Sequence, residues 1–150
     1  MEYSGLDKAI SIAVEAHRGQ TRANGLPYIM HPMRVMLKVA ASSSSVEALS
    51  VAILHDVVED TDLTFGDLQE KGISSKVIES LKLITHYHDE SYDEYIKRIY
   101  DSGDQIALLV KLSDLEDNMN LDELPNVTEK HLRRNEKYRK ARNLLCKVLK

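Results

Sequence analysis

The apolar residues of this chain recur mostly at spacings of three and four positions, which is typical of amphipathic helices. The most apolar stretch covers residues 46–58, where aliphatic side chains fall on most sides of a helix, and such helices are buried. A second apolar run, residues 106–110, falls within a helix expected from 104 to about 121. No stretch alternates for long enough to predict a strand. The pattern therefore predicts an all-α fold around a buried helix at residues 46–58.

Capping residues, glycines and prolines mark the ends of the other predicted helices. Pro32 suits the first turn of a helix, which puts His31 at the N-cap, and Ser91 with Glu94 has the spacing of a capping box. These helices are expected at residues 5–17, 32–41, 64–72, 74–84, 91–103 and 128–150, with a loop at 20–29 and a turn at 42–45. We expect roughly seven or eight helices in a single-domain orthogonal bundle.

Length and composition are those of an ordinary soluble domain. The 150 residues are 43% hydrophobic and 29% charged, which suits one domain with a single core. The net charge of −4 argues against nucleic acid as a partner, and no apolar run approaches the roughly 18 residues of a membrane span. The single cysteine, Cys146, suits a reducing compartment, and the first residues lack the features of a signal peptide. We therefore expect a cytoplasmic protein that acts without nucleic acid or membrane.

The central apolar stretch also carries charged and imidazole side chains. His55 and Asp56 are followed, after two valines, by Glu59 and Asp60. Carboxylates are rarely buried unless they are paired or bind a metal. If the helix continues through this stretch, Glu59 lies four residues past His55 and therefore on the same face. One helix would then offer two metal ligands and, one turn later, an acid directed at a water on the ion.

Ligand-type residues occur at two further helix ends or loops, and the full candidate set is His31, His55, Asp56 and Asp114. Two imidazoles and two carboxylates leave open positions on an octahedral ion, and the imidazoles favour Mn²⁺, Fe²⁺, Co²⁺ or Zn²⁺ over Mg²⁺. Such an ion lowers the pKa of bound water and polarises a phosphoryl oxygen.

Three charged residues near this set suit the hydrolysis of a phosphate ester. Glu59 and Asp60 can orient or deprotonate the water and protonate the leaving group. Arg22, in the loop before His31, can bind a phosphate through two parallel hydrogen bonds. Residue types and spacing alone do not bring these segments together.

Three motifs stand out along the chain. They are His17-x-Gly19-Gln20-x-Arg22-x-x-Gly25-x-Pro27-Tyr28-Ile29-x-His31-Pro32, then Leu54-His55-Asp56-Val57-Val58-Glu59-Asp60-Thr61, and Val110-Lys111-Leu112-Ser113-Asp114 followed by Asn118. Together they resemble the HD-domain hydrolase module of the RelA/SpoT family, from about residue 6 to about residue 121. The spacing of 24 positions between His31 and His55 fits that family.

The resemblance implies an HD-domain fold in a single domain spanning residues 1–150. It implies that Mn²⁺, or another divalent transition metal, is held by His31, His55, Asp56 and Asp114. The roles that it implies for the remaining site residues are catalytic acids at Glu59 and Asp60 and substrate contacts at Arg22 and Asn118. The reaction that it implies is hydrolytic removal of the 3′-pyrophosphate from the alarmone (p)ppGpp, a small-molecule nucleotide.

The chain also departs from the family pattern. Its 150 residues leave no room for the synthetase domain of the long enzymes, so synthesis is not expected. Ala23 stands where the family commonly has lysine, and residues 114–121 read Asp-Leu-Glu-Asp-Asn-Met-Asn-Leu where it commonly has Asp-Arg-Leu-His-Asn-Met-Arg-Thr. Cationic contacts for the nucleotide are therefore missing, and Glu116 and Asp117 add negative charge. The metal centre carries over intact, whereas the alarmone pocket does not.

Two other functions are compatible with these residues. One keeps the site and changes the substrate to NADPH 2′-phosphate or another phosphomonoester, and the other is a regulatory module that holds a nucleotide without turnover. We expect ordinary surface or core roles for His86, His88 and His131. The basic side chains of the last helix are expected to form a solvated face, although contact with an acidic partner or a second subunit, giving a homo-oligomer, is the alternative.

Overall fold

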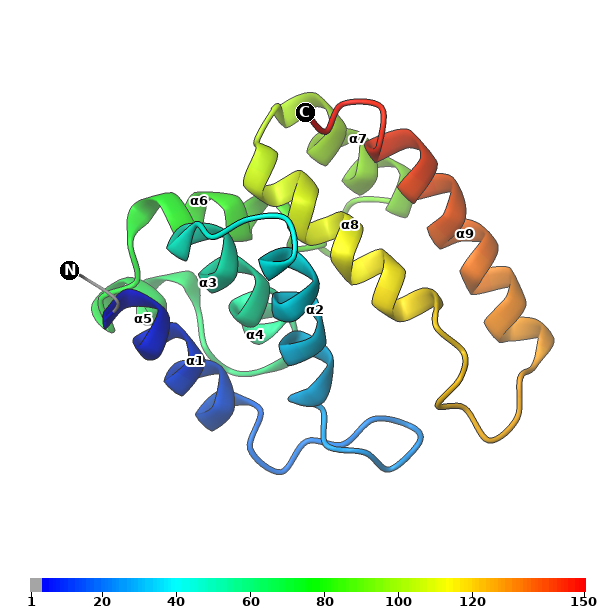
Figure 1. The fold of residues 1–150 in the computed structure, drawn as a ribbon, viewed down its shortest axis with the longest axis horizontal. Helices are drawn as coiled ribbons and strands as arrows, with labels where there is room; N and C mark the ends of the chain where they lie inside the picture. The colour runs from blue at the N-terminus through cyan, green and yellow to red at the C-terminus, as the bar shows by residue number, and fades with distance from the viewer. Residues whose placement is uncertain (1–3) are drawn as a thin grey trace.

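The computed structural model describes residues 4–150 and is helical, which confirms the predicted all-α class (Figure 1). The helices are α1 (Ser4–Ala16), α2 (Met30–Ala40), α3 (Val46–Leu54), α4 (Val57–Asp60), α5 (Phe65–Glu70), α6 (Ser75–Leu83), α7 (Tyr92–Ser102), α8 (Gln105–Met119) and α9 (Glu129–Leu145). Between α1 and α2, an isolated bridge joins Thr21 to Pro27 and closes the loop. None of the helices described has both the length and the apolar character needed to cross a membrane.

Helix α3 lies at the centre of the bundle, where it contacts α1, α2, α6 and α8 (Figure 1). Ala48 and residues 50–54 of this helix are buried. Their apolar side chains join a cluster of buried residues to which most of the other helices contribute. This arrangement confirms that residues 46–58 contain the central helix. Helices α8 and α9 lie side by side, and α9 also contacts α7, so the C-terminal helix covers one flank of the bundle.

The central helix is shorter than predicted, because it breaks at His55 and Asp56. Helix α3 ends at Leu54, and Asp56 adopts φ −104° and ψ 0° before α4 begins. In a continuous helix the Ala52 carbonyl would accept a hydrogen bond from the Asp56 amide. Here it accepts one from His55 Nδ1 at 2.7 Å and a long one from the His55 amide at 3.5 Å. Glu59 therefore belongs to the separate helix α4, and the continuous helix on which the same-face relation between His55 and Glu59 was expected does not form.

Most of the predicted helix boundaries agree with the structure. The capping box at Ser91 is confirmed, and the helices expected to begin at 64, 74 and 128 are capped by Thr64, Ser74 and Thr128. Gly103 ends α7 in the left-handed conformation, at φ 67°, which costs glycine little. The prediction for His31 is wrong, because α2 begins at Met30 and His31 lies within its first turn rather than at the N-cap. From there the His31 ring is buried inside the bundle.

Candidate metal centre and active site

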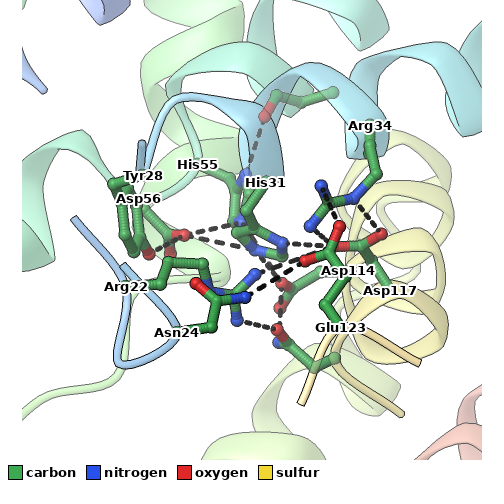
Figure 2. Close-up of polar contacts among 12 residues, drawn as sticks. Arg22, Asn24, Tyr28, His31, Arg34, His55, Asp56, Asp114, Asp117 and Glu123 are labelled. Atoms are coloured by element: carbon green, nitrogen blue, oxygen red, sulfur yellow. Dashed lines mark hydrogen bonds and ion pairs between the residues drawn. The ribbon is translucent and has the colours of Figure 1, made fainter. Parts of the chain in front are cut away.

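Four side chains from three parts of the chain come together inside the bundle, and we call them the ligand cluster: His31, His55, Asp56 and Asp114 (Figure 2). The ligand atoms of the first three lie within 4.8 Å of one another, and Asp114 contacts both imidazoles. His31 comes from α2, Asp114 from α8, and the other two from the break between α3 and α4. His31 Nε2 lies 3.0 Å from Asp114 Oδ1, 3.2 Å from His55 Nε2 and 3.4 Å from Asp56 Oδ2. His55 Nε2 lies 3.0 Å from Asp56 Oδ2 and 3.2 Å from Asp114 Oδ1.

The spacing within the ligand cluster fits a bound cation. An ion at ~2.1 Å from each ligand in octahedral geometry separates neighbouring ligand atoms by about 3 Å. The contacts between the two imidazoles and the two carboxylates cover that range, from 3.0 to 3.4 Å. Mixed imidazole and carboxylate donors suit a divalent transition metal.

The Nδ1 atom of each imidazole already donates a hydrogen bond within the protein. His31 Nδ1 lies 2.7 Å from Asp117 Oδ2, and His55 Nδ1 lies 2.7 Å from the Ala52 carbonyl oxygen. An ionised carboxylate and a carbonyl only accept hydrogen bonds, so both Nδ1 atoms carry the proton. With neutral rings, the Nε2 lone pairs of His31 and His55 would face each other at 3.2 Å, so a proton or a metal cation is favoured at this point. This orientation suits a metal site.

The charges around the cluster favour ionised carboxylates. Burial by itself raises the pKa of Asp114, but the charges of Lys111 and His55 outweigh it and hold that pKa well below its ordinary range. Lys111 Nζ lies 2.9 Å from Asp114 Oδ2. Burial lowers the pKa of His31, whereas its hydrogen bonds to Asp114, Asp117 and Asp56 raise it, with a net result of about 9. The two carboxylates thus favour positive charge at the cluster, which protons on the imidazoles or a metal ion can supply.

Glu59 and Asp60 lie in α4 and line the same cavity as the ligand cluster, which we call the first cavity and which has a volume of about 340 Å³. The Glu59 carboxylate accepts a hydrogen bond from the His86 amide, and Asp60 Oδ2 accepts one from the Tyr28 hydroxyl at 3.0 Å. Burial raises the pKa of both carboxyls, and the negative charge of Asp56 raises each further. A raised pKa makes a carboxyl a better candidate for exchanging protons with a substrate or a water.

The loop at residues 20–29 holds α4 in place through two side chains. The Tyr28 hydroxyl donates to Asp56 Oδ2 at 2.6 Å and so joins a member of the ligand cluster to Asp60. Gln20 Nε2 donates to the main-chain carbonyl of Asp60 at 2.7 Å. Burial and the two neighbouring carboxylates raise the pKa of Tyr28 far above its ordinary value, so its hydroxyl remains a donor. Sequence reasoning gave Tyr28 no role, although it lies in the first motif.

Arg22 and Asn118, the two predicted substrate contacts, lie next to each other beside the cluster. Arg22 Nη2 approaches Asn118 Oδ1 at 3.4 Å, and Asn118 Nδ2 donates to Asp114 Oδ1 at 3.0 Å. Asn118 lines the first cavity and also an adjacent one of about 330 Å³, which we call the second cavity. The cationic and imidazole side chains that line the second cavity are Arg22, Arg34, Lys130, His131 and Arg134.

Asp117 is the most important residue that sequence reasoning misjudged. We expected it to add negative charge to a nucleotide site, together with Glu116. Instead Glu116 is exposed, and Asp117 is buried against the ring of His31, with the Arg34 guanidinium at 2.8 and 3.2 Å. Its charge is therefore neutralised and orients a metal-type ligand. Its position three residues after Asp114, on the same face of α8, was a signal that could have identified it.

Two expectations agree with the structure but were incomplete. His86 is exposed, as expected for a surface residue, yet its ring stacks on Tyr95 at 4.7 Å, it lines the first cavity, and its amide donates to Glu59. The basic side chains of the last helix were expected to form a solvated face. Lys137 of α9 is exposed, and it also lines the first cavity together with Tyr138. Sequence periodicity does not reveal such contacts, because they depend on how α7 and α9 pack.

No family model matches the chain, but several proteins named as enzymes of (p)ppGpp hydrolysis resemble it. A guanosine-3′,5′-bis(diphosphate) 3′-pyrophosphohydrolase of Aquifex aeolicus is 36% identical over 119 residues, which are 76% of this chain and 17% of that protein. The protein of the same name from Vibrio cholerae is 34% identical over 127 residues, 79% of this chain and 18% of its own length. The bifunctional (p)ppGpp synthase/hydrolase SpoT of Escherichia coli is 45% identical over 65 residues, 43% of this chain and 9% of its own. The chain spans less than a fifth of the length of these relatives.

A solved structure shares the fold over nearly the whole chain. It is described as a metazoan ortholog of SpoT that hydrolyses ppGpp and plays a role in starvation responses. It superposes with a TM-score of 0.80 and 24% sequence identity, and the match covers 99% of this chain and 89% of that one. The match supports the HD-domain helical bundle that the three motifs predicted.

Proposed function

This chain belongs to the HD hydrolase modules of the RelA/SpoT type, and on that premise we propose that it is a metal-dependent hydrolase that removes pyrophosphate from the 3′ position of guanosine 3′,5′-bis(diphosphate). One observation carries the proposal. The Nε2 atoms of His31 and His55 face each other beside two carboxylates, while Glu59 and Asp60 line the same cavity. Such a combination of cation site and acids is what hydrolysis of a phosphate ester requires.

We propose Mn²⁺ as the metal, held by the ligand cluster of two imidazoles and two carboxylates. The mixed donors favour a transition metal over Mg²⁺, and Mn²⁺ accepts both donor types at six-coordinate sites. When bound, the ion would lower the pKa of a water and polarise a phosphoryl oxygen. Asp117 and the Ala52 carbonyl would keep both imidazoles in the tautomer that binds it.

Glu59 and Asp60 are proposed to move the protons. Hydrolysis breaks the bond between the ribose 3′-oxygen and phosphorus, and water supplies the new oxygen of the released pyrophosphate. One proton must leave the attacking water and one must reach the ribose 3′-oxygen. The raised pKa values of Glu59 and Asp60 suit this pair of transfers, and the Tyr28 hydroxyl and the His86 amide hold the two carboxyls beside the cluster.

Arg22 and Asn118 are proposed to bind the nucleotide where the two cavities meet. A guanidinium can bind a phosphate through two parallel hydrogen bonds, and a carboxamide offers both a donor and an acceptor. The two cavities, of about 340 and 330 Å³, adjoin at Asn118. A nucleotide that carries phosphates on both sides of its ribose can therefore place one end at the cluster and the rest in the basic second cavity.

A second candidate keeps the mechanism and changes the substrate to NADPH 2′-phosphate or another phosphomonoester. Ala23 lines the second cavity where the family commonly has lysine, and this loss of a cation favours a less highly charged substrate. A module that binds a nucleotide without turnover is the third candidate. The positions of Glu59 and Asp60 beside the cluster count against it.

We also propose that residues 1–150 form one HD-type domain that acts on small-molecule nucleotides in the cytoplasm. The buried apolar residues of the described helices form one cluster, which supports the single domain. The single cysteine, Cys146, is exposed, which supports a reducing compartment.

The test is an assay of the purified protein after removal of metals with a chelator. We expect no turnover of guanosine 3′,5′-bis(diphosphate) until Mn²⁺ is added, and then release of pyrophosphate together with GDP. Release of inorganic phosphate from NADPH or another monoester instead would support the second candidate. Turnover that does not depend on a divalent metal would contradict the mechanism, and binding without cleavage would support the third candidate.

A further inference from the structure

Helices α7 and α9 contribute part of the wall of the first cavity. Tyr92 and Tyr95 of α7 and Lys137 and Tyr138 of α9 line it, together with His86 from the loop that precedes α7. None of the three sequence motifs includes these residues. The cavity therefore extends well beyond the groups that would carry out the chemistry.

Lys137 is held over this wall by aromatic rings. Its Nζ lies 4.3 Å from the centroid of the Tyr92 ring and 5.7 Å from that of Tyr138. An ammonium group is attracted to the face of an aromatic ring, so these contacts keep the charge near the cavity although the side chain is exposed. The hydroxyl of Tyr92 is buried and has no hydrogen-bond partner within the described part of the chain. The wall thus offers one cation and one unsatisfied polar group.

The charges that line the first cavity make Lys137 the cation that is available to a ligand. The carboxylates are Asp56, Glu59, Asp60 and Asp114. The other cation is Lys111, whose Nζ is paired with Asp114 at 2.9 Å and whose side chain is largely buried. Within residues 4–150, Lys137 makes no ion pair with a carboxylate, so its charge is not already neutralised.

We propose that Lys137 binds the terminal phosphate of a 3′-pyrophosphate ester and thereby makes the site selective for pyrophosphate esters over phosphomonoesters. This inference rests on the proposed function. When water attacks the phosphorus next to the ribose, the terminal phosphate does not react and extends away from the ribose. A monoester has no such group. Lys137 therefore meets a charge that only a pyrophosphate ester carries, and the contact is present before and during the reaction.

A contact of this kind acts mainly on binding. An interaction that is equally strong in the ground state and the transition state lowers KM and leaves kcat nearly unchanged. A charge-assisted hydrogen bond from lysine to phosphate changes affinity by about tenfold or more. Lys137 is therefore proposed as a specificity-determining residue.

The test compares two guanosine substrates that differ only at the 3′ position, one with a pyrophosphate and one with a single phosphate. The full chain with Mn²⁺ is assayed as wild type and as Lys137→Met, Lys137→Arg and Lys140→Met. Lys140 lies one turn further along α9, is exposed and lines neither cavity, so it controls for the loss of one positive charge. Melting temperatures confirm that each variant is folded.

We expect Lys137→Met to lower kcat/KM for the pyrophosphate substrate about tenfold or more, mostly through KM, and to lower it much less for the monophosphate. Lys137→Arg should restore most of the loss, and Lys140→Met should behave as wild type. An equal loss of kcat/KM on both substrates, or no loss in Lys137→Met, would overturn the role proposed for Lys137 and leave the proposed function standing. Failure of the wild type to release pyrophosphate would overturn the proposed function and this assignment with it.

Discussion

Changing Asp117 to asparagine should weaken metal binding, although this residue is not itself a ligand. Asp117 Oδ2 accepts the Nδ1 proton of His31 at 2.7 Å, and its carboxylate also binds the Arg34 guanidinium at 2.8 and 3.2 Å (Figure 2). Asparagine keeps the size of the side chain but removes the charge, and it can turn its NH₂ group toward His31. The ring then loses the partner that holds its Nε2 lone pair toward the cluster.

The size of the effect follows from the contacts. Loss of a partner that orients a metal-binding histidine lowers metal affinity by about 10- to 100-fold. Stability should fall as well. Burial raises the pKa of Asp117, but its hydrogen bonds to His31 and Arg34 outweigh burial and lower that pKa to about 2. A lowered pKa stabilises the folded state above the unfolded-state value, and the contribution disappears as the pH falls toward 2. At neutral pH it is complete and corresponds to about 2 kcal/mol, or about 4–8 °C in melting temperature.

The assay is calorimetric titration of the metal-free protein with Mn²⁺, with thermal melting in the presence of chelator as a second measurement. Glu116→Gln is the matched control, because it makes the same chemical change at the neighbouring, exposed position of α8. We expect Asp117→Asn to bind Mn²⁺ at least about tenfold more weakly and the control to bind as wild type. Equal Mn²⁺ affinity in Asp117→Asn and wild type would refute the reasoning, because His31 would then need no partner at Nδ1.

Three further predictions concern the proposed catalytic acids, the Tyr28 hydroxyl and the metal. Glu59→Ala should bind Mn²⁺ normally and lose about 10²- to 10⁴-fold in kcat, because Glu59 lines the cavity without belonging to the ligand cluster. Calorimetry measures the Mn²⁺ affinity and steady-state kinetics the rate. A wild-type kcat in this variant would rule out a role for Glu59 in proton transfer. Tyr28→Phe should lower kcat about tenfold with little change in KM, because Asp56 and Asp60 lose the hydroxyl that bonds both of them. A change confined to KM would contradict the proposed positioning role of Tyr28. Chelator should lower the melting temperature of the Mn²⁺-loaded protein by about 5–10 °C if Mn²⁺ was present at roughly 100 times its Kd, and an unchanged value would mean that the folded state holds no metal.

The sequence predicted those features that depend on local patterns. Helix caps at Ser91 and Thr128 are short-range signals, and the apolar run at residues 46–58 is itself the reason that α3 is buried. The break after α3 was not predicted. At the break the His55 side chain bonds the Ala52 carbonyl, and its ring also contacts His31 and Asp114 from other helices. Helical periodicity contains no information on contacts between residues so far apart in the sequence.

The candidate site was predicted from motifs, and its surroundings were not. The motifs named the ligand cluster, and the fold brings its two imidazoles to within 3.4 Å of both carboxylates across as many as 83 positions of sequence. Asp117 was misjudged because its partners, His31 and Arg34, are also more than 80 positions away. Lys137 was assigned to solvent for the same reason, since the cavity wall forms only when α9 packs against α7 and α8.

The most direct test of the central claim is the position of manganese in crystals grown with Mn²⁺, measured by anomalous scattering at the manganese edge. The account predicts a single strong peak bonded to His31 Nε2, His55 Nε2, Asp56 Oδ2 and Asp114 Oδ1, at ~2.0–2.3 Å from each. A peak elsewhere in the molecule, or one that contacts His55 and Asp56 but neither His31 nor Asp114, would contradict it.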